Sequence, residues 1–246
     1  MINYAMRRAL LAGTMRAGGA VPDLLTNLRW YYDLDEDSGN AIANYGSGGN
    51  LTANGAPGQS DGPIGNARSL NGTSQYFSSG AGIISHFELP TESAFTLSFW
   101  FYPTSATGNR DIIGIGNGAD WNFSANLSWG VRLLNSSGLV RFAFDDEGLI
   151  SNLDSDTGVS LNNWHHLLLS DTGTIAYLSI DGAAPSTKLH GAIIRNSLLT
   201  TLYIGAIETY FAGRLTRFGF WDRYIEPGSA EAIALATYPY TYAELT

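Results

Sequence analysis

The stretch Phe95-Thr-Leu-Ser-Phe-Trp-Phe-Tyr-Pro103 decides the fold class. Its side chains alternate with the period of two that is typical of a β-strand. One face of this strand carries the side chains of Phe95, Leu97, Phe99 and Phe101. The opposite face still holds two aromatic residues, Trp100 and Tyr102, so we expect an inner strand that is covered on both faces, and Pro103 ends it.

Short segments of the same kind recur on both sides of this strand. Turn-forming clusters separate them, such as residues 45–50 and 54–58, and Asp171-Thr-Gly173 is typical of a β-hairpin. The sequence predicts further strands over residues 29–34, 110–115, 128–134, 139–144, 164–170, 174–180, 199–204 and 214–222. It predicts one late helix over residues 229–237, with Ser229 as its N-cap. This pattern indicates an all-β fold, a jelly-roll sandwich of two antiparallel sheets.

The composition agrees with one large β domain. The chain has 246 residues, of which 44% are hydrophobic and only 14% are charged. A helical protein usually carries more Lys and Glu on its exposed faces. Because the chain has no cysteine, disulfides, thiol catalysis and thiolate metal sites are excluded.

The charge excludes a nucleic-acid-binding function. The formal net charge is −9, and Lys188 is the only lysine. A protein that binds nucleic acid needs a basic surface to displace counterions from the phosphates. A membrane helix needs ~18 consecutive apolar residues, and no run in the sequence approaches that length, so we expect no membrane partner.

Residues 1–24 form an N-terminal arm of distinct charge. Arg7, Arg8 and Arg16 all precede Asp23, the first acidic residue of the chain. The ordinary interpretation of such a segment is a disordered tail. We favour an anchoring arm, which would dock on a neighbouring protein through electrostatic attraction to an acidic surface.

Several segments together resemble the laminin-G-like jelly rolls of the concanavalin A-like lectin/glucanase superfamily. Residues 32–39 (YDLDEDSG) resemble the family's opening strand and turn. Residues 95–103 resemble the family's F-T-I-S-x-W-x-x-P strand. Further similarities lie at residues 65–76 (GNARSLNGTSQY), 163–166 (NWHH), 177–182 (YLSIDG), 204–205 (IG) and 211–223 (FAGRLTRFGFWDR). The resemblance implies a laminin-G-like jelly roll over residues 25–237, followed by a C-terminal tail, 238–246.

The arm, the opening turn and the Thr237-Tyr-Pro239 ending are also similar to modules of bacteriophage virion proteins. This second resemblance implies a position on the virion surface. The partners would then be other virion subunits, bound through the arm. Homo-oligomers and a cell-surface glycan remain open as partners, and so does an extracellular location.

Catalytic residues are not expected. A retaining glycanase needs two carboxyl groups about 5–5.5 Å apart, and the family's laminarinase-type branch carries them as Glu-x-Asp-x-x-Glu, a motif the sequence lacks. Asp33, Asp35 and Asp37 are the nearest candidates, but their place in the opening turn favours solvated or capping roles. His165 and His166 follow Trp164 in the family's hairpin, where we expect structural roles.

Calcium is the cofactor that many relatives bind, and we do not favour it here. The family's aspartates at two positions are replaced by Asn71 and Thr216. Calcium prefers six to eight oxygen ligands that include carboxylates. We therefore predict no metal and no other cofactor.

Ligand binding would depend on aromatic and amide side chains in loops. Sugar rings stack on exposed aromatic faces, and amides bind their hydroxyls. Trp121, Asn122 and Tyr210 are the candidates, with partial burial under a loop as the alternative. Trp100, Trp164 and Trp221 are interpreted as core residues.

Three functions are consistent with these observations. The first is a non-catalytic virion surface protein, a capsid decoration or a tail component. The second is a carbohydrate-binding module of a secreted bacterial protein. The third and least favoured is a glycoside hydrolase.

Overall fold

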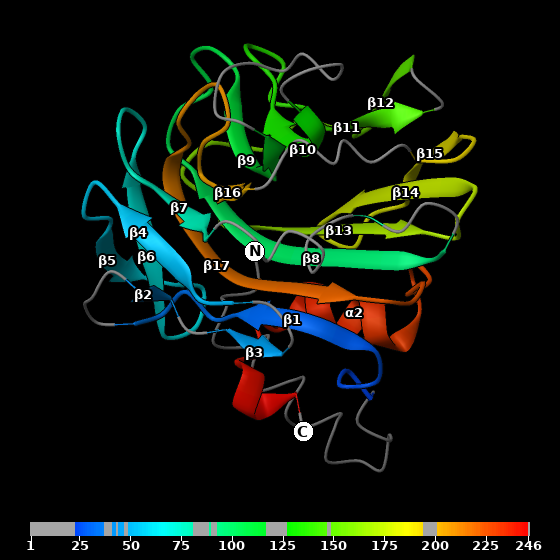
Figure 1. The fold of residues 1–246 in the computed structure, drawn as a ribbon, viewed down its shortest axis with the longest axis horizontal. Coiled ribbons are helices and arrows are strands. Elements are labelled where there is room, and N and C mark those ends of the chain that lie inside the picture. The colour runs from blue at the N-terminus through cyan, green and yellow to red at the C-terminus, as the bar shows by residue number, and fades with distance from the viewer. Residues whose placement is uncertain are drawn as a thin grey trace.

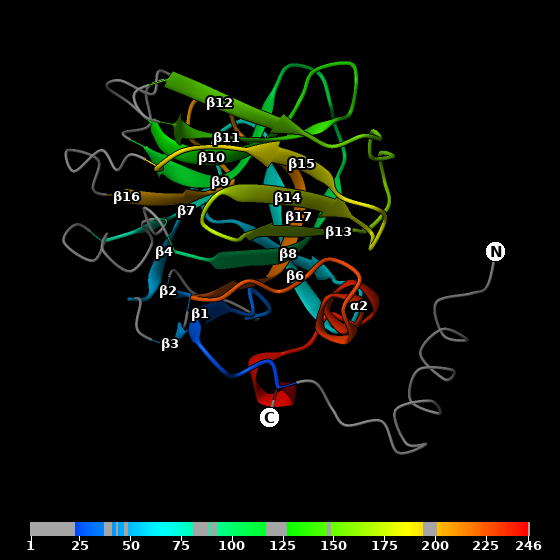
Figure 2. The ribbon, with the colours of Figure 1, turned by 90° about the vertical axis from the view of Figure 1, so that its right-hand side faces the viewer.

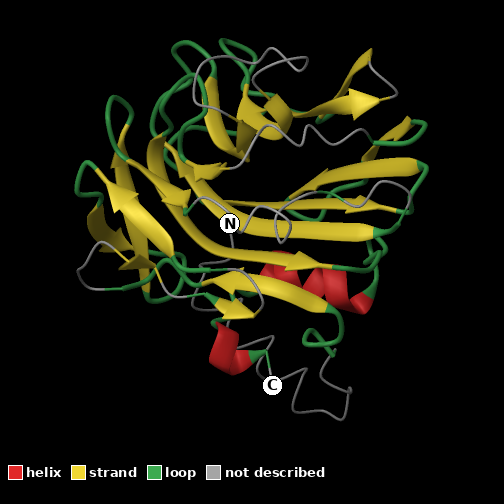
Figure 3. Ribbon diagram, in the orientation of Figure 1, coloured by secondary structure: helices red, strands yellow, loops and turns green. Residues whose placement is uncertain are grey.

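The computed structural model describes residues 23–36, 41–42, 44–46, 49–80, 89, 93–116, 127–146, 149–193 and 201–245. These residues form two antiparallel β-sheets that pack face to face, and strands dominate the structure (Figures 1 and 3). The predicted all-β sandwich is confirmed. Among the described residues, no helix is both long and apolar enough to cross a membrane.

The sheet that we call sheet A is built around β8. Its order is β15-β14-β13-β8-β17-β1-β3, and β6 joins β17 and pairs with β5. The strands are β1 (Leu28–Tyr32), β3 (Tyr45–Gly46), β5 (Gly58–Asp61), β6 (Asn66–Asn71), β8 (Phe95–Pro103), β13 (His165–Asp171), β14 (Ile175–Ile180), β15 (Ser186–Leu189) and β17 (Ala212–Trp221).

The sheet that we call sheet B faces it, with the order β12-β11-β10-β9-β16-β7-β4-β2. Its strands are β2 (Ala41–Ile42), β4 (Leu51–Asn54), β7 (Tyr76–Ser79), β9 (Arg110–Gly116), β10 (Leu127–Leu133), β11 (Val140–Asp146), β12 (Leu149–Asp154) and β16 (Thr201–Ile204). Strands that are distant in sequence, such as β7 and β16, are therefore neighbours in space.

The alternation in β8 positions its side chains as expected. Phe99 and Phe101 are fully buried in the core between the sheets, and Phe99 stacks on Phe218 of β17 with 4.6 Å between ring centroids. Trp100 lies on the outer face and is only 7% exposed. Because β13 and β17 pair with β8 on its two edges, the predicted inner strand is confirmed.

The outer face of sheet A is covered by α2 (Ala230–Thr237) and by residues that flank it. The helix lies against sheet A and away from β12 (Figure 2). Ser229 caps it, since its side chain accepts a hydrogen bond from the Ala232 backbone, as predicted. Trp100 Nε1 donates to the Leu235 backbone oxygen at 3.2 Å, which joins the helix to the sheet.

Both ends of the described chain also pack on sheet A. Trp221 Nε1 donates to the Leu24 backbone oxygen at 2.7 Å, and the Tyr31 hydroxyl donates to the Tyr240 backbone oxygen at 2.5 Å. Leu245 is 3% exposed in the same cluster. Residues 238–245, which we expected as a tail, thus contribute to this outer layer.

Candidate functional site

Three tyrosines form an aromatic patch on the outer face of sheet B. Tyr76 lies on β7, Tyr203 on β16, and Tyr210 in the loop after β16. The ring centroids of Tyr76 and Tyr203 are 5.9 Å apart, and those of Tyr76 and Tyr210 are 6.1 Å apart. All three side chains are half-buried. Since Phe77 and Ile204, their sequence neighbours, are fully buried in the core, the two strand tyrosines must face outward. We call this set the tyrosine patch.

The loop over residues 205–211 is fixed on the sheet by backbone contacts. The Phe211 N–H donates to the Gly205 oxygen at 2.8 Å. Asp111, fully buried on β9, accepts hydrogen bonds from the backbone N–H groups of Glu208 and Thr209, both at 2.7 Å. Arg110 Nη1 donates to the Tyr210 backbone oxygen at 3.1 Å. Tyr210 is therefore held in place before any ligand arrives.

Two small residues of sheet B, Ala143 and Gly114, allow this loop to lie close to the sheet. Ile207 packs with Ala143 and Tyr203. A Cβ added at Gly114 would lie 2.6 Å from the Ile207 side chain. Glycine at this position therefore leaves the space that the loop occupies.

Polar groups surround the tyrosine patch. Ser78 pairs with Tyr203 across the β7–β16 register and accepts a hydrogen bond from Asn54 Nδ2 at 3.0 Å. Partial burial, together with the two neighbouring tyrosines, raises the pKa of the Tyr76 hydroxyl. Among the described residues, no protein group hydrogen-bonds to the three phenol hydroxyls.

A separate cavity of about 580 Å³ lies on the other sheet, between α2 and the turn that follows β14. We call it the tryptophan cavity. Its lining residues are Trp100, Trp164, Asp181, Gly182, Ile233, Ala236 and Thr237. Trp164 is half-buried, so its interpretation as a core residue was wrong, whereas Trp100 and Trp221 are buried as predicted. Trp164 lies outside the core, just before β13, where its ring contacts Tyr102 with 5.5 Å between ring centroids.

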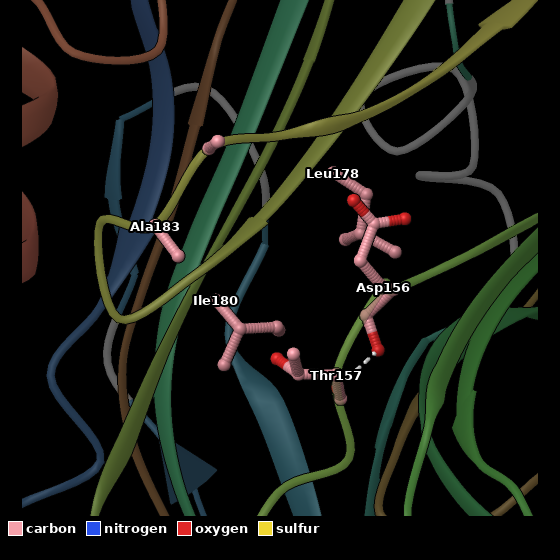
Figure 4. A pocket seen from close by; sticks show the side chains of 7 residues that line it. Asp156, Thr157, Leu178, Ile180 and Ala183 are labelled. Carbon is pink, nitrogen blue, oxygen red and sulfur yellow. Dashed lines mark hydrogen bonds between the residues drawn. The ribbon is translucent and has the colours of Figure 1, made fainter.

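A smaller pocket of about 220 Å³ opens at one edge of the sandwich (Figure 4). Leu178, Ile180 and Ala183 form its apolar side, and Asp156 and Thr157 face them. Asp156 accepts a hydrogen bond from Ser186 Oγ at 2.8 Å. This contact joins the segment after β12 to β15, so the carboxylate has a structural role.

The structure describes only one of the predicted site residues. Tyr210 lies in the tyrosine patch, and its two partners Tyr76 and Tyr203 were not predicted from the sequence. The alternation of buried and outward side chains along β7 and β16 could have indicated these two tyrosines, because each is the sequence neighbour of a core residue. Trp121 and Asn122, and the arm residues Arg7, Arg8 and Arg16, lie outside the described residues.

Comparison with known proteins identifies the family. Residues 71–230 match the model of a family described as the concanavalin A-like lectin/glucanases superfamily. The chain belongs to this superfamily. The laminin-G-like resemblance of the sequence is therefore confirmed at the level of the domain, whereas the virion context has no counterpart in the comparisons. No curated protein sequence matches the chain.

Solved structures of this superfamily fold are similar over most of the chain. Domain 4 of AbnA, an extracellular arabinanase from Geobacillus stearothermophilus in complex with arabinotriose, is 17% identical over 85% of this chain and 98% of that domain, with a TM-score of 0.64. The binding domain of Paraclostridial Mosquitocidal Protein 1 is 18% identical over 85% of this chain, with a TM-score of 0.65. Trypanosoma rangeli sialidase is 15% identical over 91%, with a TM-score of 0.62.

The chain spans 52% of the mosquitocidal binding domain and 34% of the sialidase. At these identities the similarity shows the fold alone.

The residues at the superfamily's calcium positions do not fit a calcium ion. Asn71 Oδ1 already accepts hydrogen bonds from the backbone N–H groups of Thr73, Ser74 and Gln75 at 3.0–3.3 Å. The buried Thr216 hydroxyl donates to the Asp33 backbone oxygen at 2.8 Å. Neither side chain supplies a carboxylate, the ligand that calcium prefers. Within the described part of the chain, no three His, Asp or Glu side chains group as a metal site.

Two carboxylates of the opening turn, those of Asp33 and Asp35, form ion pairs with Arg217. Arg217 Nη1 lies 3.4 Å from Asp33 Oδ1 and 3.0 Å from Asp35 Oδ2. Burial raises the pKa of Asp33 to about 6, although Arg217 acts in the opposite direction. The Asp33 carboxylate also accepts the Tyr242 N–H at 3.0 Å. These contacts tie the opening turn to β17 and the C-terminal segment, which is a structural role.

Proposed function

We propose that this chain is a non-catalytic glycan-binding domain whose ligand rests on the tyrosine patch. The observation that carries the proposal is that β7 and the segment formed by β16 and its following loop bring Tyr76, Tyr203 and Tyr210 together on one outward face. A buried carboxylate, Asp111, fixes the loop that supplies the third ring. An aromatic patch that is fixed in advance loses little conformational entropy when it binds.

The chemistry of the patch suits a sugar ring. The apolar C–H face of a pyranose or furanose can stack on phenol rings, and their hydroxyls, with the neighbouring Asn54 and Ser78, can bind its hydroxyl groups. A pair of aromatic side chains contributes about 0.5–1.5 kcal/mol, and we expect a similar gain from a sugar ring that stacks on a phenol ring. Three such contacts would give the weak affinity of a binding module, which gains strength when several copies bind together.

The arabinanase domain that was solved with arabinotriose has the same fold and supports this proposal by analogy. It does not identify the ligand of this chain. A neutral oligosaccharide is the ligand class that the patch favours, because the rings and amides present no charge to the sugar.

We further propose that the domain is displayed on the surface of a virion, as a capsid decoration or a tail component. The support comes from the sequence: Arg7, Arg8 and Arg16 lie together before the first acidic residue, on a chain with a net charge of −9. Such an arm could be attracted to an acidic subunit. Secretion as a free carbohydrate-binding module is the competing location.

A glycan array probed with the full chain tests the first proposal. We expect selective binding to a neutral glycan class, and a Tyr210→Ala variant should bind that glycan three- to tenfold more weakly, the equivalent of about 0.6–1.4 kcal/mol. Tyr177→Ala is the matched control, because Tyr177 lies on β14 of sheet A, where its ring contacts Tyr224, away from the tyrosine patch. A flat array, hydrolysis of the bound glycan, or equal losses in both variants would contradict the proposal.

The virion location requires a different measurement. Mass spectrometry of purified particles should detect the full chain, and a chain that lacks residues 1–24 should fail to join them. Absence of the intact chain from the particles would contradict this location and would leave glycan binding untouched.

A further inference from the structure

The tryptophan cavity lies on the outer face of sheet A and takes no part in the tyrosine patch on sheet B. Its volume of about 580 Å³ is within the range of small-molecule sites. One wall is formed by Ile233, Ala236 and Thr237 of α2. The opposite wall contains Asp181 and Gly182 of the turn between β14 and β15, and two indoles complete the lining.

The two indoles are rigidly supported. Trp100 is almost fully buried, and its Nε1 is committed to the Leu235 oxygen of α2. Trp164 rests on Tyr102, with 5.5 Å between ring centroids. The polar group of Trp100 is therefore turned away from the cavity, and an indole face attracts a cation more strongly than any other aromatic side chain.

The acidic wall is equally well fixed. Asp181 and Gly182 both have positive φ, at 55° and 73°, the backbone of a tight type I′ turn. Asp181 Oδ1 accepts the His166 N–H at 2.8 Å, and Oδ2 accepts from His165 Nδ1 at 2.7 Å. A carboxylate oxygen has two lone pairs, so each oxygen keeps acceptor capacity, and 49% of the side chain is exposed.

The helix adds negative potential at the same place. The last turn of α2, which lines the cavity with Ala236 and Thr237, contains no basic residue. The C-terminal end of a helix carries a partial negative charge that a nearby cation would stabilise. Indole faces, a half-exposed carboxylate and an uncompensated helix end thus all favour positive charge.

We infer that the tryptophan cavity binds an alkylammonium group, with the ammonium near Asp181 and the alkyl chain against Trp164 and Ile233. Ile233 is 54% exposed, and an aliphatic ligand would cover it. A lysine side chain of a partner protein and a free primary amine share this chemistry. Glycan binding at the tyrosine patch is independent of this inference.

NMR titration of the full chain, observed at the indole N–H signals, tests the inference. The probes are Nα-acetyl-lysine methylamide, n-butylamine and, as the neutral comparison, Nα,Nε-diacetyl-lysine methylamide. We expect the first probe to shift the Trp164 signal, which Trp164→Phe identifies by its loss, and the diacetylated compound to leave it unchanged. A shift with n-butylamine as well would indicate that a free amine suffices, and a shift with the lysine derivative alone would indicate a peptide.

Asp181→Asn should weaken binding about tenfold, and asparagine tolerates the positive φ of this position. Asp156→Asn is the matched control, because Asp156 lines the other pocket, and it should leave the affinity unchanged. The inference is overturned if neither cationic probe shifts the signal, if the diacetylated probe binds equally, or if the two variants behave alike. It is also overturned if a neutral oligosaccharide shifts this signal and the amines do not.

Discussion

Asp111 and Arg132 form a buried ion pair beneath the loop that carries Tyr210, with 2.9 Å between Oδ1 and Nη2. Arg132 Nη2 also lies 3.0 Å from Glu208 Oε2, within that loop. The second oxygen of Asp111 accepts the N–H groups of Glu208 and Thr209. One fully buried carboxylate therefore couples two sheet strands to the position of a candidate ligand-binding ring.

Replacing Asp111 with alanine should strongly destabilise the domain and loosen this loop. Removing one partner of a buried pair leaves the other charge without compensation and costs about 3–5 kcal/mol. Urea denaturation, followed by tryptophan fluorescence, measures the free energy of unfolding. Asp154→Ala is the matched control: its pair with Arg141 is about one-third exposed, so its loss should cost clearly less than the loss of the fully buried Asp111. Equal effects of the two variants would contradict the role given to Asp111.

Gly114 allows the loop to pack, so Gly114→Ala should displace it. The added Cβ would lie 2.5 Å from the Trp129 oxygen and 2.6 Å from the Ile207 side chain. We expect a loss of about 1–3 kcal/mol and weaker glycan binding at the tyrosine patch. At Gly58 the nearest atom would be 3.8 Å away, so Gly58→Ala should be nearly neutral. A crystal structure of the Gly114→Ala variant with the loop in its original place would refute this explanation.

The sequence was sufficient for the strands with strong apolar alternation. β8, β13, β14 and β17 lie within two residues of their predicted bounds, because each contributes alternate side chains to the core. β5 was missed since its residues, Gly58-Gln-Ser-Asp61, include no apolar side chain. Only its pairing with β6 makes it a strand. Pairing with a neighbouring strand cannot be recognised from the local sequence of β5.

The candidate site was less accessible from the sequence. Tyr210 was predicted as an exposed aromatic residue in a loop, but its partners depend on the pairing of β7 with β16. These strands are more than a hundred residues apart in the chain, and their order in the sheet follows from the topology. Trp164 illustrates the converse error: it lies beside the core strand β13, but its ring lines the tryptophan cavity and is only half-buried.

Residues 238–245 should contribute to stability although the sequence presented them as a tail. A chain that ends at Thr237 loses the bond from Tyr31 to the Tyr240 oxygen and uncovers Arg217, whose Nε donates to the Pro239 oxygen at 3.3 Å. We expect a clearly lower midpoint in thermal unfolding. Tyr31→Phe removes the first bond alone and should cost about 1 kcal/mol. An unchanged midpoint in the shortened chain would show that this segment only lies on the surface.

His166 should make the domain sensitive to acid. Burial lowers its pKa from 6.5 to about 3, against a smaller opposing effect of Asp181. Between these two pH values the unfolded chain binds a proton at this site that the folded protein does not, so the free energy of unfolding falls as the pH decreases from about 6.5 toward 3. The loss reaches about 2–3 kcal/mol at pH 4.5, because each pH unit contributes about 1.4 kcal/mol.

His166→Gln isolates this effect, because glutamine does not titrate and can still reach Ser98 Oγ, which lies 2.8 Å from His166 Nε2. Other groups titrate in the same range, and Asp33, whose pKa is raised to about 6, acts in the opposite direction. The informative quantity is therefore the difference between the two proteins in urea denaturation at pH 7 and pH 4.5. The wild type should lose about 2 kcal/mol more than the variant on acidification. A difference that is the same at both pH values would mean that His166 binds a proton equally well in the folded protein and in the unfolded chain.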